Sequence, residues 1–221
     1  MQKRTFRENL EQLLPAYARM PLLFLVIINL LAYYGSRLIP LQMAPLNMQL
    51  PLDGRIPFRQ EWIIIYILAY LQWVVGYVLI ARESREHCRR VLTGEMIAKL
   101  ICMVLFVVLP TRIERPQVEG RGLCASLVRL IYATDAPINL FPSIHCLESW
   151  ICFRGAVGMK RVPRWYAPAM LVLTLLVFAS TVLVKQHVLV DIPAGILVGE
   201  VGLLLANRLF AIRQRRKGGC E

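Results

Sequence analysis

The sequence predicts an all-α integral membrane bundle of about six transmembrane helices. Hydrophobic residues make up 57% of the chain and the mean hydropathy is +0.54, whereas a soluble domain typically contains about 45–50% apolar residues. Apolar runs of about 20 residues, the length that crosses a bilayer, recur along most of the chain. A chain of this composition is expected to place its apolar surface in lipid.

Six apolar runs define the predicted spans: 20–36, 61–81, 91–110, 142–159, 165–184 and 187–207. The last two are separated by so few residues that they predict a tight helical hairpin. No Gly/Ser linker, low-complexity tract or internal repeat divides the chain, so residues 20–208 are interpreted as one membrane domain. A polar segment, 1–19, precedes this domain and lacks the pattern of a cleavable signal peptide. A basic tail, 209–221, follows it.

Lysine and arginine are unevenly distributed among the predicted connections. The connections on the side of the two termini hold 17 of the 26, those on the opposite side hold 8, and Lys99 lies within the third span. By the positive-inside rule both termini are expected to be cytoplasmic. The net charge of +12 is therefore attributed to membrane orientation and not to nucleic-acid binding, because the basic residues form short clusters between apolar runs.

The two longest connections, the cysteines and the targeting signals allow four further predictions. The connection 112–141 contains the apolar residues Leu127, Val128, Leu130 and Ile131, which predict a short helix at the membrane interface. The Pro-rich connection 37–60 is expected to lie near it on the outer side. The six cysteines show no CxxC pairing, which disfavours a disulfide framework or a zinc site. Short connections without a eukaryotic targeting signal favour a bacterial inner membrane.

Ionisable residues at membrane depth are costly, so they usually face a cavity or a partner. His187 and Asp191 stand four residues apart, a spacing that places two side chains on one face of a helix. The carboxylate can then accept a hydrogen bond from one ring nitrogen and leave the other as a nucleophile or base. A buried pair that only packs helices is the alternative interpretation.

The segment Asn139–His145 reads NLFPSIH and predicts the start of a helix. Pro142 suits a first helical position, and the free amides of a helix start can bind an anion close to Ser143 and His145. The alternative is a capped helix that carries an incidental histidine.

Arginines in the segment PTRIERP supply a third group of polar residues on the same side of the membrane. The guanidinium groups of Arg112 and Arg115 suit phosphate oxygens, although basic residues also commonly flank spans. Glu148 lies one turn beyond His145 and either faces the cavity or pairs with another helix. Glu95 and Lys99 are interpreted as a structural pair in the third span.

In this order, the three segments resemble the signature of the type 2 phosphatidic acid phosphatase superfamily, a group of membrane lipid phosphatases. Its pattern is Lys, six residues, Arg-Pro; then Pro-Ser-Gly-His; then Ser-Arg, five residues, His, three residues, Asp. The resemblance covers about residues 91–207, the expected catalytic core. The matching residues are Arg115 and Pro116, then Pro142, Ser143 and His145, then Ser180, His187 and Asp191.

Two cations of the family pattern are replaced in this chain. Val108 stands where the lysine is expected, and Thr181 stands where the second arginine is expected. We hypothesise that Arg112, one turn from Arg115 if that stretch is helical, and Lys185, two residues before His187, supply the missing charge.

The resemblance implies a role for each matching residue. His187 would attack phosphorus and form a phosphohistidine, Asp191 would orient its ring, and His145 would protonate the leaving alkoxide and later activate water. The resemblance also implies no metal and no other cofactor. The implied phosphate-binding residues are Arg115, Ser143, Lys185, Arg112 and Ser180.

Three functions stay open on the sequence. The first is a phosphatase that transfers the phosphate of a lipid phosphate or diphosphate to water. The second is a lipid headgroup phosphotransferase of the sphingolipid synthase type, which resembles this family and uses a similar set of two histidines and an aspartate. The third is a noncatalytic membrane protein on a decayed scaffold. A channel is disfavoured because the polar residues gather near one membrane face.

Overall fold

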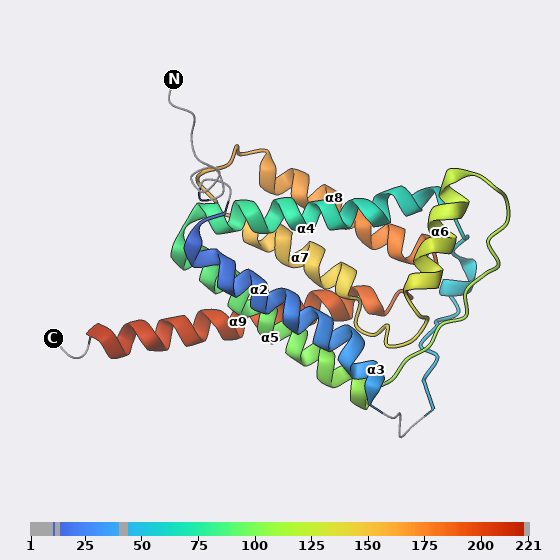
Figure 1. Ribbon diagram of the computed structural model, residues 1–221, viewed down its shortest axis with the longest axis horizontal. Coiled ribbons are helices and arrows are strands. Elements are labelled where there is room, and N and C mark those ends of the chain that lie inside the picture. The colour runs from blue at the N-terminus through green and yellow to red at the C-terminus, as the bar shows by residue number, and fades with distance from the viewer. Residues whose placement is uncertain (1–10, 12–13, 40–43, 219–221) are drawn as a thin grey trace.

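The computed structural model describes residue 11 and residues 14–39 and 44–218, and the fold below refers to these residues. They form an all-α bundle in which β pairing is limited to two isolated bridges. Five of the helices are long and apolar enough to cross a membrane (Figure 1). The structure therefore confirms the predicted fold class.

The first span is a long helix that widens near one end. α2 (Ala16–Leu30) continues through a π-helical turn, η1 (Leu31–Gly35), into the short α3 (Ser36–Leu38). The predicted span 20–36 thus lies inside a continuous helical segment of 23 residues. Most of its large apolar side chains are exposed, as expected for a helix whose outer face contacts lipid.

The second and third spans form a helical hairpin joined by Ser84 alone. α4 (Ile63–Glu83) ends before Ser84 and α5 (Arg85–Val108) begins after it. The Ser84 hydroxyl accepts a hydrogen bond from the His87 amide at 3.1 Å and caps the first turn of α5. Because of this cap, α5 begins six residues before the predicted span 91–110, in an Arg-rich segment that hydropathy alone excludes.

Two shorter helices lie at one end and at the centre of the bundle. α6 (Leu123–Thr134) is the short apolar helix predicted within the connection 112–141. α7 (Ile144–Ala156) takes the place of the predicted span 142–159 but has 13 residues. Its length is about 20 Å, which is less than the ~30 Å hydrocarbon core of a bilayer. Five helices of spanning length are therefore accompanied by a short central one.

The last two helices form the predicted hairpin with different boundaries. α8 (Tyr166–Leu183) matches the predicted span 165–184, whereas α9 (Asp191–Gly218) begins four residues after the predicted start at 187. The turn between them is therefore longer than expected. α9 also continues as a helix through most of the predicted tail 209–221.

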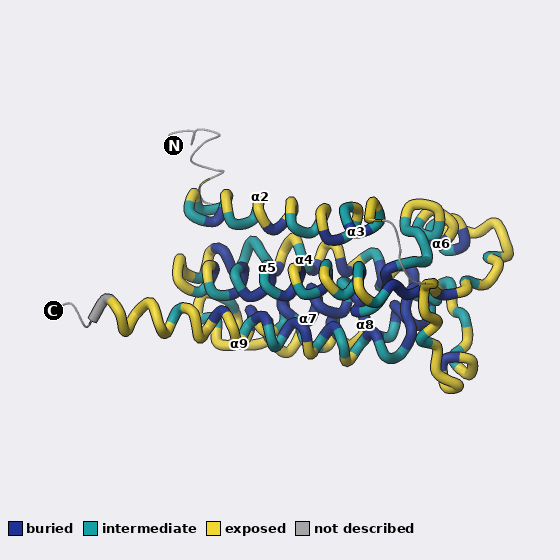
Figure 2. The backbone as a smooth tube through the Cα atoms, turned by 90° about the horizontal axis from the view of Figure 1, so that it is seen from below, coloured by how far each residue is buried: buried dark blue, intermediate teal, exposed yellow. Residues whose placement is uncertain are grey.

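α7 lies at the centre of the bundle and packs against α4, α5, α8 and α9. Most of its residues are buried, and Figure 2 shows α2 as a separate layer on one side of the other helices. The start of α2, the α4–α5 turn and the end of α9 lie at one end of the bundle, and α6 lies at the other (Figure 1). The connections therefore fall into the two groups that the sequence predicted.

α5 and α9 approach each other so closely that glycine is required in both. A Cβ atom added at Gly202 would lie 2.3 Å from the carbonyl oxygen of Gly94 and 2.9 Å from the Cβ atom of Ala98. A Cβ atom added at Gly94 would lie 3.0 Å from the Cα atom of Leu203. Small residues allow membrane helices to pack through their backbones in this way.

Gly202→Ala is therefore expected to destabilise the bundle. The added methyl group would force α5 and α9 apart, a cost of about 1–3 kcal/mol. Gly199→Ala is the matched control, because its nearest neighbour would be the Cδ1 atom of Trp150 at 3.4 Å, an ordinary contact. Thermal unfolding in detergent measures both changes, and equal midpoints for the two variants would contradict the close crossing.

Candidate active site

A pocket of about 260 Å³ lies near the α6 end of the bundle. Its walls come from α2, η1, α4, α5, the end of α6, the segment before α7, the first turns of α7 and the α8–α9 turn. Both predicted catalytic histidines, His145 and His187, line it, together with the carboxyl groups of Asp135 and Glu148. Residues that are distant in sequence thus meet in one cavity.

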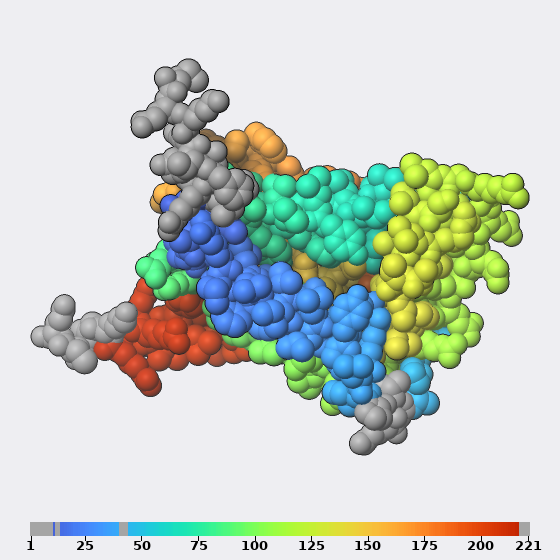
Figure 3. Space-filling model, viewed as in Figure 1, coloured from blue at the N-terminus to red at the C-terminus, as the bar shows by residue number. Residues whose placement is uncertain are grey.

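The pocket opens sideways between two spanning helices. Asn29 and Leu30 of α2 line one side, and Tyr70 and Trp73 of α4 line the other. Figure 3 shows the surface hollowed between α2 and α4, with α7 visible at the bottom of the hollow. A ligand can therefore reach the histidines from the flank of the bundle, where the surrounding surface is apolar.

His187 and Asp191 form the predicted pair, although the local structure differs from the prediction. The Nδ1 atom of His187 lies 2.9 Å from the Oδ2 atom of Asp191, which also accepts a hydrogen bond from the amide of Val188 at 3.1 Å. His187 lies in the turn before α9 and not on the same helical face as Asp191, the first residue of α9. The contact leaves the Nε2 atom of His187 as the available nitrogen.

Two backbone hydrogen bonds and one residue with positive φ define the shape of the α8–α9 turn. The carbonyl oxygen of Thr181 accepts hydrogen bonds from the amides of Gln186 and His187 at 3.0 and 3.1 Å. Lys185 adopts a positive φ of 52°, a conformation that is uncommon for residues other than glycine. Because this strained backbone is tied to the end of α8, the ring of His187 is fixed relative to the bundle.

His145 lies in the first turn of α7 within a group of aromatic rings. Its ring stacks on Tyr66 with a centroid separation of 4.2 Å, and the ring of Trp73 lies 5.0 Å away. The Nδ1 atom is 3.4 Å from the Tyr66 hydroxyl, whereas the buried Nε2 atom has no hydrogen-bond partner among the described residues. The ring centroids of His145 and His187 are 6.2 Å apart, so one small substrate group can contact both.

The segment before α7 is fixed by hydrogen bonds to an extended segment at residues 111–113. The Thr111 hydroxyl accepts hydrogen bonds from the amides of Leu140 and Phe141 at 2.9 and 3.1 Å, and the Thr111 carbonyl accepts one from the amide of Asn139. Asn139 has a positive φ of 56°. Ser143 is the N-cap of α7, so the helix begins at Ile144 and not at the predicted Pro142.

Arg115 lies beside the α8–α9 turn and bridges three parts of the site. Its guanidinium donates to the carbonyl oxygen of Asp135 at 2.6 Å and to the side chain of Gln186, the residue before His187. It also lies 4.6 Å over the ring of Tyr132. Burial lowers the pKa of Arg115 below its ordinary value. The predicted cation is therefore next to the site, with most of its donors bound to protein atoms.

The other predicted phosphate ligands do not line the pocket. Arg112 is exposed in an extended segment, so the helical turn that would have brought it close to Arg115 is absent. The ammonium group of Lys185 donates to the carbonyl oxygens of Asp53 and Ile56 at 3.0 and 2.6 Å. The buried Ser180 hydroxyl donates to the carbonyl oxygen of Val177, and Ser143 uses its hydroxyl to cap α7.

The contacts of Lys185 explain how the connection 37–60 is placed near the site. The Asp53 carboxylate accepts a hydrogen bond from the amide of Leu189 at 2.8 Å, and the amide of Arg59 donates to the carbonyl oxygen of Leu183 at 2.9 Å. Together with the bonds of Lys185, these contacts fasten the part of the connection that is described to the α8–α9 turn.

The two positions where the family pattern has cations also face away from the pocket. Val108 is 57% exposed and lines an apolar groove between α5 and the C-terminal end of the first span. Thr181 is fully buried, and its hydroxyl donates to the carbonyl oxygen of Phe178.

The two carboxyl groups that line the pocket, those of Glu148 and Asp135, each contact a cation. The ammonium group of Lys99 lies 2.5 Å from Glu148 and 3.3 Å from Glu95, so the expected pair of Glu95 and Lys99 is confirmed and extended. Arg37 lies 3.3 Å from Asp135. Burial raises the pKa of Asp135 to about 6, against a lowering by the charge of His187.

Several residues at the site have no local signal in the sequence. Tyr66, Arg37, Asp135 and Gln186 contact the site residues described above. Arg37 and Asp135 are 98 residues apart, and the hydropathy pattern places each of them only in a connection between spans. A polar residue that directly follows an apolar helix, as Asp135 does, is the one clue that the sequence offered.

The fold and the site define an all-α membrane bundle with a pair of histidines, one of them buried and bound to a carboxylate, in a pocket open between two helices. Comparison with protein-family models, with curated proteins and with solved structures finds no match to this chain. In the described part of the chain, no group of three or more His, Cys, Asp or Glu side chains is arranged to hold a metal ion.

Proposed function

We propose that the protein is a membrane phosphatase that hydrolyses a lipid phosphate or diphosphate through a phosphohistidine. The observation that carries the proposal is the arrangement of His187, bound through Nδ1 to Asp191 at 2.9 Å, and His145, whose ring lies 6.2 Å away across the same pocket. This arrangement provides a nucleophile with an orienting carboxylate and a second group for proton transfer.

The reaction uses both histidines in turn. The Nε2 atom of His187 attacks phosphorus, a bond from nitrogen to phosphorus forms, and the bond from phosphorus to the leaving oxygen breaks. His145 in its protonated form donates a proton to that oxygen. The neutral ring of His145 then takes a proton from water, which attacks the phosphohistidine and releases inorganic phosphate. Asp191 stabilises the charge that develops on His187 during both steps.

The electrostatics of the pocket are compatible with a phosphate. An uncompensated carboxylate would repel the anion, but Glu148 contacts Lys99, which it shares with Glu95, and Asp135 is paired with Arg37. Arg115 adds a further positive charge beside His187. A pocket with these compensated charges can therefore accept a phosphoryl group.

The size and opening of the pocket favour a lipid. A volume of about 260 Å³ is slightly below the roughly 300–1,000 Å³ of sites that enclose a whole drug-sized ligand. It suits a head group, with the acyl chains outside in the hollow between α2 and α4 (Figure 3). We place the site at the outer face of a bacterial inner membrane, because the lysine and arginine excess is at the opposite end of the bundle.

The direct test is release of inorganic phosphate by the purified protein in detergent micelles. Phosphatidic acid, phosphatidylglycerophosphate and a polyprenyl diphosphate are the substrates, each with and without a chelator. Chelator-resistant release above a blank without protein is the expected result. A folded protein that releases phosphate from none of the three substrates would contradict the proposal.

A headgroup phosphotransferase is the second candidate, because the pocket is also lined by polar groups other than the two histidines. Glu148, one turn further along α7, and Asn29 of α2 offer polar contacts to the hydroxyl group of an acceptor. If this function is correct, a labelled phosphoryl headgroup will move to an added diacylglycerol or ceramide without appearing as inorganic phosphate.

A further inference from the structure

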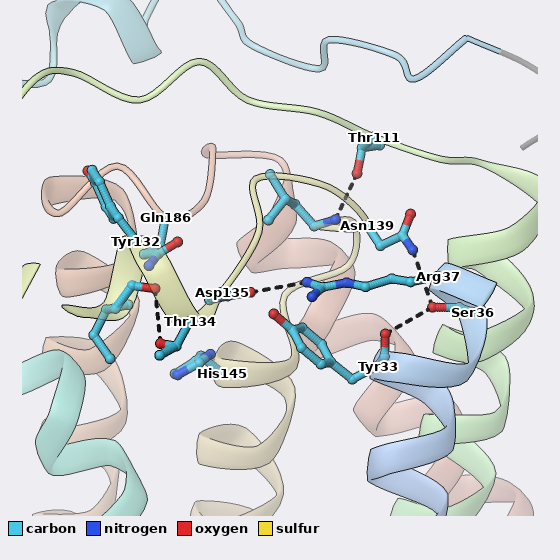
Figure 4. A network of polar contacts seen from close by, with 12 residues as sticks. Tyr33, Ser36, Arg37, Thr111, Tyr132, Thr134, Asp135, Asn139, His145 and Gln186 are labelled. Carbon is cyan, nitrogen blue, oxygen red and sulfur yellow. Dashed lines mark hydrogen bonds and ion pairs between the residues drawn. The ribbon is translucent and has the colours of Figure 1, made fainter. Parts of the chain in front are cut away.

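Arg37 lies at the outer end of the first span and reaches toward the pocket. Its side chain is 16% exposed, its Nη2 atom is 3.3 Å from the Oδ1 atom of Asp135, and its guanidinium lies 3.9 Å over the ring of Tyr33. Figure 4 shows the side chain extending from α3 toward Asp135, above His145. The sequence placed Arg37 only in an outer connection.

Both partners of Arg37 belong to the pocket wall. Tyr33 and Asp135 line the cavity together with the two histidines. Asp135 is also near the proposed nucleophile, because Arg115 donates both to the carbonyl oxygen of Asp135 and to the side chain of Gln186, the residue before His187. A phosphoryl group bound at His187 would therefore be close to the carboxylate that Arg37 contacts.

The contact between Arg37 and Asp135 leaves most of the guanidinium unused. It is a single contact of 3.3 Å, longer than the 2.7–2.9 Å that is usual for charge-assisted hydrogen bonds. The buried Nε atom of Arg37 has no hydrogen-bond partner among the residues described. Arginine binds phosphate through two parallel hydrogen bonds, which a single long contact to a carboxylate does not provide.

The other cations near the site are committed to protein groups. Lys185 donates to two carbonyl oxygens, and Lys99 is held between two carboxylates. The Nε atom of Arg115, like that of Arg37, has no partner among the described residues, but both of its terminal nitrogens donate, to the carbonyl oxygens of Tyr132 and Asp135 and to the side chain of Gln186. Arg37 therefore has more unused donor capacity than Lys185, Lys99 or Arg115.

We propose that Arg37 binds the phosphoryl oxygens of the substrate through the guanidinium donors that its contact with Asp135 leaves unused. This inference rests on the proposed function, and it makes the first helix a part of the active site as well as a membrane anchor. It also accounts for the absence of cations facing the pocket at Val108 and Thr181, because the charge comes from a different helix. Asp135 is a positioning residue that holds Arg37 beside the pocket.

The test compares Arg37→Ala, Arg37→Lys and Asp135→Asn with the exposed Arg121→Ala as control. Two quantities are measured in detergent: kcat/KM for phosphatidic acid, and the affinity for orthovanadate by calorimetry. Arg37→Ala is expected to lower kcat/KM by about 10²–10³-fold, the usual effect of removing one transition-state donor, and to weaken vanadate binding at least about tenfold. Arg37→Lys keeps the charge and should lose less.

Asp135→Asn separates this role from a merely structural one. If Arg37 binds phosphate, Asp135→Asn frees the guanidinium and should lose far less activity than Arg37→Ala. Equal losses in both variants with unchanged vanadate affinity would overturn the inference, because the ion pair would then only support the fold. Should Arg37→Ala fail to fold, Arg37→Lys and Asp135→Asn decide the question by the same comparison.

Failure of the proposed function gives a different result. If the wild-type protein has no phosphatase activity but binds vanadate in a manner that depends on Arg37, the anion site stands and the proposed function fails. If the wild-type protein hydrolyses phosphatidic acid and Arg37→Ala retains full kcat/KM and full vanadate affinity, this inference fails and the proposed function stands.

Discussion

His187→Ala is expected to reduce phosphate release from phosphatidic acid by about 10⁴-fold or more, which is the scale of loss when a covalent nucleophile is removed. The ring nitrogen that attacks phosphorus would be absent, and no other described side chain is held by Asp191 in the same position. The same variant should form no covalent phosphoenzyme. The measurement is capture of radiolabel from ³²P-phosphatidic acid after rapid denaturation in base, which preserves phosphohistidine.

His87→Ala is the matched control for this experiment. His87 lies in the first turn of α5, near the end of the bundle opposite α6, and its Nε2 atom is 2.8 Å from the carbonyl oxygen of Gly155. Because it is distant from the pocket, its replacement should leave labelling intact. Labelling that persists in His187→Ala and disappears in His87→Ala would show that the nucleophile has been assigned to the wrong histidine.

His145→Gln is expected to separate the two steps of the reaction. With an alkyl phosphate, loss of the proton donor should slow the first step by about 10²–10⁴-fold. With p-nitrophenyl phosphate, whose leaving group needs no proton, the first step should survive and the second should fail. The predicted result is a burst of about one nitrophenolate per protein, followed by slow turnover and an accumulated phosphoenzyme.

Glutamine is chosen at position 145 because the site is tightly filled. The ring of His145 stacks on Tyr66 and lies 5.0 Å from Trp73, so alanine would leave a cavity and confuse loss of chemistry with loss of structure. A stopped-flow trace shows the burst. Equal slowing of both substrates with no burst would mean that His145 does not act as the acid and base assigned to it.

The bundle itself was predictable because hydropathy is a local property. Each apolar run is long enough to be recognised as a membrane span without knowledge of its neighbours. The approximate positions of α2, α4, α5, α8 and α9 follow from these runs. The boundaries were less predictable because they depend on capping and turns. Ser84 caps α5 inside an Arg-rich segment. Ser143 caps α7, which therefore begins at Ile144, two residues after the predicted start at Pro142.

The contact between His187 and Asp191 was predictable for a related reason, since four residues limit how far apart two side chains can lie. The reason given for it was wrong, because His187 lies in a turn that the strained backbone of Lys185 and the carbonyl of Thr181 define. The helical turn assumed between Arg112 and Arg115 is likewise absent, because residues 111–113 pair with the segment before α7.

The sequence by itself determined the membrane class, the approximate spans, the grouping of the connections and the three residues that carry the proposed chemistry. The tertiary structure alone decided which cations contact residues of the pocket wall. Lys185 turns toward backbone carbonyls, Val108 faces outward, and Arg37 crosses to Asp135, 98 residues away. Hydropathy and residue spacing are local properties, whereas the direction of a long cationic side chain is set by neighbours from other helices, which only the packed bundle brings together.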